Sequence, residues 1–215
     1  KTGKPIVLIL SNGRPLELCR LEPVCDAIVE IWQPGIAGGK PLAGILTGRI
    51  NPSGKLPITF PYATGQIPIY YNRRQRARPH QGKYQALKIE PLYEFGHGLS
   101  YTTFEYGDLK ASATQLKRGD KLSVEVAVTN TGDRDGAETV YWFITDPYST
   151  ITRPVKELKY FEKQTIRAGE TRTFRFEVDL LRDLGFIDGD GKRFLEKGTY
   201  YVQVKDKKVK LELID

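Results

Sequence analysis

The carboxylates near the start of the chain are the side chains best suited to acid–base or nucleophilic chemistry. Glu17, Glu22, Asp26 and Glu30 are scattered along the first thirty residues at intervals of five, four and four. Catalysis by two carboxyl groups requires them to face each other closely across the reacting bond. The intervals give no such pair, and solvated surface groups are the simpler interpretation of all four. We therefore assign no catalytic residue in this chain.

Sulfur and imidazole groups offer no metal or redox site either. Cys19 and Cys25 are the only cysteines, and their spacing differs from that of CxxC redox or zinc pairs. The two histidines, His80 and His97, are far from them in the sequence. A disulfide across one short helix would need awkward geometry, so we predict two buried free thiols.

Two further segments have only a superficial likeness to ligand-binding loops. Asn51 to Pro57 contains Lys55, but it lacks the glycine spacing of a phosphate-binding loop, so a tight turn is expected. Asp188-Gly189-Asp190-Gly191 is similar to the start of a calcium loop. No glutamate stands at the twelfth position of that loop, and the sequence therefore favours a hairpin turn.

The elements that would position a site begin with the apolar run Ile6 to Leu10, which is typical of a strand buried on both faces of a parallel sheet. We expect a short helical segment from Pro15 toward Cys25, a strand over Asp26 to Trp32, and a helix over Gly38 to Leu46. This alternation implies a right-handed parallel crossover. With only two such strands, this part is interpreted as the end of an α/β domain.

The start of the sequence also indicates a piece of a longer protein. There is no methionine, so Lys1 is not expected to be a translation start. No small-residue cleavage site follows the first ten residues, and no signal peptide is predicted. No apolar run approaches the length of a membrane span, so no membrane partner is expected.

A short strand is predicted over Leu56 to Phe60, followed by a long ordered connector that extends to about Pro91. The connector contains the densest basic segment, Asn72 to Lys83, with arginines at 73, 74, 76 and 78. No recognition-helix or ribonucleoprotein motif accompanies these arginines, and the net charge of +7 is a mild excess. We expect them to pair with acids of a neighbouring domain, and we expect no nucleic-acid partner.

The segment Pro91 to Tyr106 places the aromatic residues Tyr93, Phe95, Tyr101 and Phe104 around the turn Gly96-His97-Gly98. Glycine allows a tight turn there, and the aromatic rings can bury large areas on both sides. A structural clamp between domains is the expected role. His97 is a candidate proton shuttle by its ordinary pKa, but a turn residue is favoured because no partner acid can be placed.

Strand-like alternation dominates the rest of the chain. Leu122, Val124, Val126 and Val128 recur at every second position. Similar runs follow over Ala137–Thr145, Thr171–Asp179, Gly198–Lys205 and Val209–Ile214, with Gly- and Asp-containing turns between them. Short strands at regular intervals predict an antiparallel sandwich of about seven strands.

Several motifs occur together in a fixed order: SNGRPLEL (11–18), EIWQPGIAGGKPLAGILTGRINPSGKLPITFP (30–61), YEFGHGLSYTTFEY (93–106), GAETVYWF (136–143), RPVKELKYFEK (153–163) and AGETRTFRFEV (168–178). With these motifs the chain resembles the C-terminal portion of a family 3 glycoside hydrolase of the β-glucosidase type. The resemblance extends over essentially the whole chain, and NPSGKLP and FGHGLSYTTF are its most specific segments.

The resemblance implies an α/β domain end at residues 1–60, a connector at 61–100 and a fibronectin-III-like sandwich at 101–215. It also implies that an N-terminal (β/α)8 barrel carries the nucleophilic aspartate and that a loop before Ile6 carries the acid/base glutamate. Both groups would lie outside this chain, which is expected to be inactive alone. No cofactor and no metal are implied, and a bacterial extracytoplasmic location is expected.

Loops after the carboxyl ends of parallel strands line binding crevices, and here these loops are Ser11–Arg14 and Trp32–Gly39. Arg14 is a candidate to hydrogen-bond a sugar or a barrel acid, and Trp32 to stack on a sugar. The competing interpretation is that Trp32 packs in the core and that Arg14 holds its own loop. We weigh the two equally for Arg14 and favour core packing for Trp32.

The function expected for the parent is retaining, exo-acting hydrolysis of β-D-glucosyl residues from oligosaccharides. A β-xylosidase or an N-acetylglucosaminidase parent is an alternative, because related enzymes share this C-terminal region. A non-catalytic carbohydrate-binding or domain-interaction module is another alternative function. Homodimerisation through the sandwich or the connector is a further alternative that the sequence leaves undecided. An aromatic row facing solvent would favour the binding module.

Overall fold

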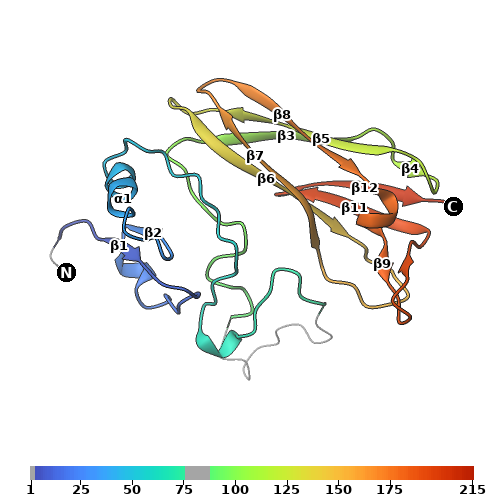
Figure 1. Cartoon of the computed structure of the whole chain (residues 1–215), viewed down its shortest axis with the longest axis horizontal. Coiled ribbons are helices and arrows are strands. Elements are labelled where there is room, and N and C mark those ends of the chain that lie inside the picture. Colours follow the sequence, from blue (N-terminus) through green and yellow to red (C-terminus); the bar gives the residue numbers. More distant parts are fainter. Residues whose placement is uncertain (1–2, 76–87) are drawn as a thin grey trace. The chain divides into compact units, whose positions relative to one another are not determined.

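The computed structural model describes residues 3–75 and 88–215, which form two compact units (Figure 1). Among these residues the first unit contains 3–71 and 88–99, and the second contains Asn72–Gln75 and Ser100–Asp215. The predicted domain division at residues 60 and 100 stays a prediction. His80 and the basic residues Arg76, Arg78 and Lys83 lie outside the described residues.

The first unit contains the parallel strand pair and the helix that the sequence predicts. Strand β1 (Val7–Leu10) pairs in parallel with β2 (Ala27–Glu30), and Leu10 lies opposite Glu30. Helix α1 spans Gly39–Leu46. Parallel pairing brings the carboxyl ends of β1 and β2 to the same edge of the sheet, where the loops of interest begin.

The predicted helical segment from Pro15 toward Cys25 is largely wrong. Only a short 3₁₀ helix, Glu22–Val24, forms there. The preceding residues have no regular secondary structure, because Leu18 is 1% exposed in a hydrophobic cluster and Leu16 packs against the same cluster. Alternate residues facing one core require an extended backbone rather than a helical one.

The predicted strand Leu56–Phe60 is also wrong. The segment makes a single bridge, between Phe60 and Tyr93, rather than a ladder. Proline at positions 57 and 61 has no N–H to donate, which prevents continuous pairing there. Phe60 nevertheless holds the unit together, since it is 1% exposed and forms the core with Leu10 and Leu18.

Two burial predictions for this unit need correction. Cys19 and Cys25 are free thiols, as expected, but both are only half-buried. The strand predicted to be buried on both faces is not so within this chain, since Ile6, Val7 and Ile9 are 42%, 46% and 38% exposed. A sheet of two strands cannot cover both of its own faces.

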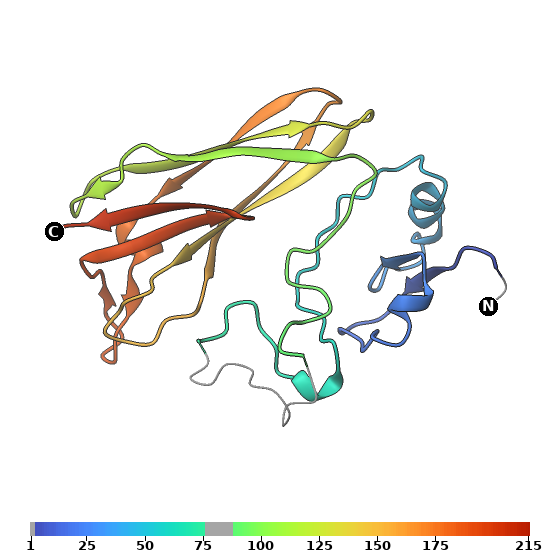
Figure 2. The same cartoon turned by 180° about the vertical axis from the view of Figure 1, so that it is seen from behind.

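The second unit is a sandwich of two sheets, seen from both sides in Figures 1 and 2. One sheet has the order β3 (Phe104–Ala111), β5 (Leu122–Asn130) and β8 (Thr171–Val178). The other has the order β4 (Gln115–Leu116), β12 (Lys207–Leu213), β11 (Gly198–Val204), β6 (Gly136–Thr145) and β7 (Glu157–Ile166). Neighbours are antiparallel except for β4 and β12, which are parallel.

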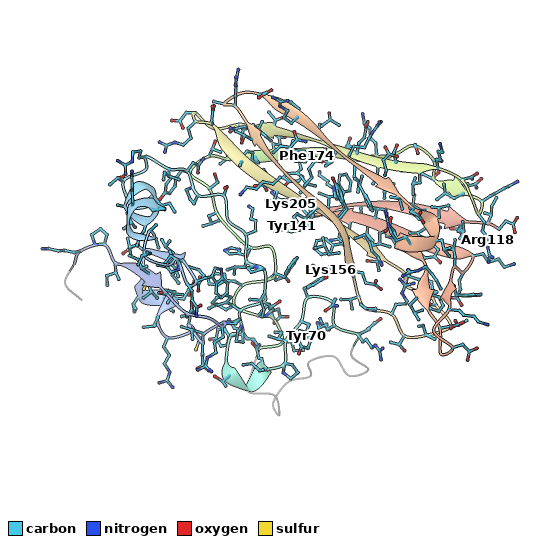
Figure 3. All side chains as sticks on the ribbon, viewed as in Figure 1. Tyr70, Arg118, Tyr141, Lys156, Phe174 and Lys205 are labelled. Atoms are coloured by element: carbon cyan, nitrogen blue, oxygen red, sulfur yellow. The ribbon has the colours of Figure 1, made fainter. Side chains whose placement is uncertain are left out.

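The core between the sheets is formed by the alternating residues that the sequence predicts. Val124, Val126 and Val128 of β5 are at most 1% exposed, and Trp142 is fully buried. Phe174, which is labelled in Figure 3, is also fully buried. Strand β7 was not predicted from the sequence. Its pairing with β6 shifts between Trp142 and Phe143, and this shift interrupts the alternation of apolar and polar residues. The inward position of Trp142 rather than Phe143 confirms that one of the two faces the core.

Two smaller elements complete the second unit. The hairpin predicted at Asp188–Gly191 is confirmed, since β9 (Phe186–Ile187) pairs antiparallel with β10 (Arg193–Phe194) across it. A π-helical turn, Leu180–Leu184, precedes it. In the part of the chain that the structure describes, no helix has the length and apolar character needed to cross a membrane.

Candidate functional site

The carboxyl edge of the β1–β2 sheet carries the two loops that the sequence singles out. The first loop turns through Ser11-Asn12-Gly13-Arg14, and Asn12 Nδ2 donates a hydrogen bond to the Arg14 carbonyl at 2.8 Å. Ser11 Oγ donates to the Trp32 carbonyl at 3.0 Å, which joins this loop to the second one. The edge is therefore a single hydrogen-bonded corner rather than two independent loops.

Arg14 is exposed on this corner. Its backbone carbonyl closes the loop, and no ion pair of its guanidinium is recorded among the described residues. An exposed guanidinium has five N–H donors that suit sugar hydroxyls or a carboxylate. The backbone carbonyl of Arg14 therefore holds the loop, and the Arg14 side chain lies at the surface.

Trp32 combines core packing with an uncommon backbone conformation. The residue is half-buried, and its ring lies 6.0 Å from that of Phe60, tilted by 56°. It packs against the cluster of Leu10, Leu18 and Phe60. Its φ of 50° lies in the left-handed region, which bulky residues rarely adopt. Trp32 therefore packs in the core, which is the interpretation favoured from the sequence. Because the residue is only half-buried, the rest of its side chain is accessible to a ligand.

Glu30 belongs to the same corner, although no sequence motif singles it out as a site residue. Its Oε1 accepts a hydrogen bond from the Trp32 N–H at 2.7 Å. Its Oε2 is buried without a hydrogen-bond partner among the described residues. The one available signal is its place as the last residue of β2, two positions before the tryptophan.

The other carboxylates near β1 and β2 serve local structure. Glu17 accepts two hydrogen bonds of 2.6 Å from Thr64, through the backbone N–H and the hydroxyl, and these bonds lower the pKa of the Glu17 carboxyl. Asp26 Oδ2 accepts from the Ile6 N–H at 2.7 Å, at the amino edge of the sheet. Both side chains hold backbone segments together, which supports the assignment of no catalytic role.

Three carboxylates are buried in the described part of the chain, all in the second unit. Each is paired with a basic side chain: Glu138 with Lys205, Asp146 with Arg153, and Asp183 with Arg182. Burial raises the pKa of the Asp146 carboxyl, and the Arg153 guanidinium opposes that rise. The Asp146 side chain is only 2% exposed, so a substrate cannot reach it.

His97 lies in the turn of the aromatic segment. Its N–H donates to the Glu94 carbonyl at 3.0 Å, and its carbonyl accepts from Leu56 at 2.7 Å. The ring stacks on Tyr93 with centroids 4.7 Å apart. Loss of solvent around the ring lowers the pKa of His97, and Lys55 adds to that effect. A neutral imidazole in a hydrogen-bonded turn fits the structural role that the sequence favours.

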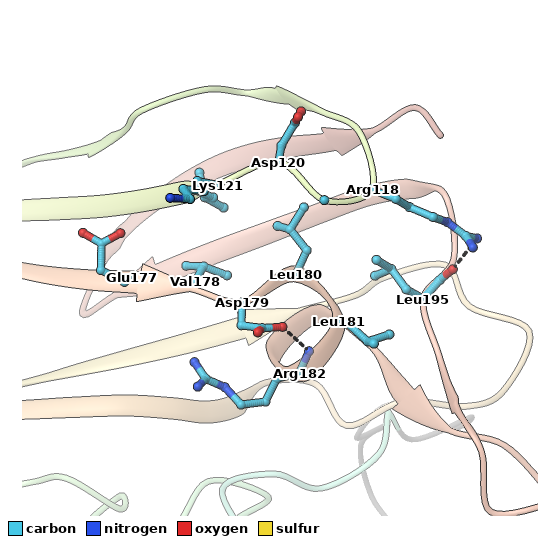
Figure 4. Close-up of a pocket in the computed structure, with 12 residues that line it drawn as sticks. Arg118, Asp120, Lys121, Glu177, Val178, Asp179, Leu180, Leu181, Arg182 and Leu195 are labelled. Carbon is cyan, nitrogen blue, oxygen red and sulfur yellow. Dashed lines mark hydrogen bonds between the residues drawn. The ribbon is translucent and has the colours of Figure 1, made fainter.

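A pocket of about 700 Å³ opens at one end of the sandwich (Figure 4). Leu180 and Leu195 contribute apolar surface, and the charged side chains around it include Arg118, Lys121 and Asp179. Arg118 donates to the Leu195 carbonyl at 2.9 Å, and Asp179 accepts from the Arg182 N–H at 2.8 Å. The Arg118 and Asp179 side chains thus bind backbone groups of the same unit, and they do not form a catalytic arrangement. In addition, no group of metal-ligating side chains occurs among residues 3–75 and 88–215.

Comparison with known families and proteins agrees with the two-unit architecture. Residues 1–101 match the glycosyl hydrolase family 3 C-terminal domain, and residues 138–208 match the fibronectin type III-like domain. A periplasmic beta-glucosidase of Salmonella typhimurium is 44% identical over 94% of this chain. A beta-xylosidase of Formosa agariphila is 38% identical over 95%.

A solved structure extends the agreement to three dimensions. The crystal structure of beta-glucosidase from Listeria innocua in complex with glucose matches 98% of this chain with a TM-score of 0.90 and 39% identity. The chain spans 27% of the Salmonella relative's length and 31% of the Listeria chain. These matches agree with the motifs at 51–57 and 93–106. The chain therefore belongs to glycosyl hydrolase family 3 and forms a C-terminal portion of an enzyme of that family.

Proposed function

We propose that the enzyme containing this chain is a retaining, exo-acting β-glucosidase that releases terminal β-D-glucosyl residues from oligosaccharides. The observation that carries the proposal is the 44% identity, over 94% of this chain, to a relative named as a periplasmic beta-glucosidase. The match to a structure described as a beta-glucosidase in complex with glucose also supports it. The name of the Salmonella relative further supports a bacterial extracytoplasmic location.

Within that enzyme this chain has a supporting part. Retaining hydrolysis requires two carboxyl groups about 5–5.5 Å apart, one as nucleophile and one as acid/base. The carboxylates described above hold backbone segments or pair with basic side chains, so we place both catalytic groups on the rest of the enzyme, including a (β/α)8 barrel. The apolar side chains of Ile6, Val7 and Ile9 suit packing against helices of the rest of the α/β domain, which cover the faces of a parallel sheet.

Arg14 and Trp32 are the residues of this chain that we propose to face the substrate. They follow the carboxyl ends of neighbouring parallel strands, where ligands bind in open α/β sheets. An exposed guanidinium can hydrogen-bond sugar hydroxyls, and an indole ring can pack on the apolar face of a sugar. Replacing Arg14 or Trp32 by alanine in the complete enzyme should raise KM more than it lowers kcat.

A β-xylosidase is the second candidate, because a relative with 38% identity is named as one. Steady-state assays of the complete enzyme with aryl β-D-glucoside, β-D-xyloside and N-acetyl-β-D-glucosaminide separate the candidates. We expect the highest kcat/KM with the glucoside, a product of retained configuration by NMR, and no turnover by residues 1–215 alone. Preference for the xyloside would favour the second candidate. Turnover by the isolated chain would refute the supporting role, and a complete enzyme that hydrolyses none of the three would favour a non-catalytic module.

A further inference from the structure

We infer that Glu30 is a positioning residue, which fixes Trp32 at the substrate-facing edge of the parallel sheet. The inference rests on the proposed function, since it gives Glu30 a part in binding the sugar. It concerns a residue that the sequence pattern did not select, and it does not give Glu30 a direct role in the chemistry.

The backbone of Trp32 is held in a conformation that the residue would not adopt by itself. A φ of 50° is an outlier for a bulky side chain, and such outliers persist only where the surroundings impose them. Both polar groups of the Trp32 backbone are bound by side chains. The N–H donates to Glu30 Oε1 at 2.7 Å, and the carbonyl accepts from Ser11 Oγ at 3.0 Å.

The Glu30 bond is the stronger of the two constraints. Its acceptor is a carboxylate, and hydrogen bonds to ionised acceptors are shorter and about twice as strong as neutral ones. The bond is also part-buried, so water competes for it only weakly. With Oε2 lacking a partner among the described residues, the bond to Trp32 is the interaction that the structure gives this carboxylate.

The backbone conformation determines where the indole ring lies. The ring packs on Phe60 and is half-buried, so the core holds one part of it and leaves another accessible. If φ relaxed to an ordinary negative value, the Cα–Cβ bond would change direction and the ring would leave this orientation. A displacement of about 1 Å in a positioning group can cost about 10²-fold in rate or binding.

The test uses the complete enzyme and an aryl β-D-glucoside. Glu30→Ala should raise KM about tenfold and leave kcat nearly unchanged, because sugar binding is lost equally in the ground and transition states. Glu30→Gln should restore most of the wild-type KM, since its amide oxygen can accept the same hydrogen bond. Neither change should alter the pH dependence of kcat.

Asp26→Ala is the matched control. Asp26 also accepts a 2.7 Å hydrogen bond from a backbone N–H, but at the amino edge of the same strand pair. Its bond is exposed, so Asp26→Ala should lower the stability no more than Glu30→Ala does, and it should leave KM unchanged. An unchanged KM in Glu30→Ala, an equal rise in Asp26→Ala, or failure of Glu30→Gln to rescue would overturn the inference.

The experiment also distinguishes misfolding of a variant and failure of the proposed function from failure of the role inferred for Glu30. Should Glu30→Ala not fold, Glu30→Asp keeps the carboxylate on a side chain one methylene shorter, which cannot reach the Trp32 N–H in the same geometry, and it must raise KM with kcat kept; a wild-type KM there overturns the inference. Wild-type enzyme without glycosidase activity refutes the proposed function itself. A wild-type enzyme that hydrolyses glucosides, with variants that do not change KM, refutes only the role of Glu30.

Discussion

Gly98 lies where residues 54–55 and 98 of the first unit approach each other closely, and Gly98→Ala should destabilise that unit strongly. A Cβ on Gly98 would overlap the Gly54 carbonyl oxygen and lie 3.0 Å from Lys55 Cδ and 3.2 Å from Lys55 Cα. Most of these atoms belong to backbone, so they cannot rotate away. The two segments would have to separate by about 1 Å to restore ordinary van der Waals distances.

The separation would also weaken the hydrogen bonds that join the segments. Lys55 Nζ donates to the Gly98 carbonyl at 2.8 Å, and Leu56 N–H donates to the His97 carbonyl at 2.7 Å. Overpacking costs about 1–3 kcal/mol, and each weakened bond adds up to about 1 kcal/mol. We therefore expect Gly98→Ala to lower the free energy of unfolding by about 2–4 kcal/mol.

The assay is urea unfolding together with hydrogen–deuterium exchange of residues 54–60 and 91–98. Gly54→Ala is the control, because a Cβ there meets no heavy atom within 4 Å. It should change the free energy of unfolding by less than about 0.5 kcal/mol. Equal unfolding midpoints for the two variants, or unchanged exchange in both segments, would show that the close approach of Gly98 does not hold the unit together.

Two other predictions concern buried polar groups and pH. Asn130→Ala should cost about 2–4 kcal/mol, because this fully buried amide donates to the Ile166 carbonyl at 2.9 Å and accepts from Thr102 at 2.6 Å, and its loss leaves those groups unsatisfied; a midpoint of thermal unfolding equal to that of the wild type would contradict this. His97 should titrate below its ordinary pKa of 6.5, so its contribution to stability is complete above pH 6.5 and decreases as the pH falls from 6.5 through the folded-state pKa. Because the residue remains exposed overall, the effect should be small, and NMR titration of the His97 ring, assigned with His97→Gln, checks its sign.

The strands and helix with a strong hydrophobic period could be predicted from the sequence. In β5 the apolar residues occupy every second position, and this pattern alone identifies a strand with one buried face. Strands β1 and β2 and helix α1 were predictable for a similar reason, since apolar runs ended by glycine and proline mark element boundaries. The family resemblance, which depends on local motifs, was likewise contained in the sequence.

Tertiary structure decided the elements whose local pattern is weak or is overridden by packing. Residues 56–60 have strand-like composition, but two prolines and a single bridge partner leave only one pairing. Strand β7 lacks clean alternation, and its antiparallel pairing with β6, which a register shift interrupts, is what makes it a strand. Burial of Leu18 in the core kept residues 15–18 extended, which no local signal shows.

The candidate site shows the same division. The sequence placed Arg14 and Trp32 after neighbouring parallel strands, because strand ends can be recognised from hydrophobic runs. It could not give the φ of 50° at Trp32 or the contact with Glu30, since both depend on how two loops meet in space. Sequence patterns report which residues share a face, whereas a hydrogen bond between side chain and backbone depends on distances that only the folded chain defines.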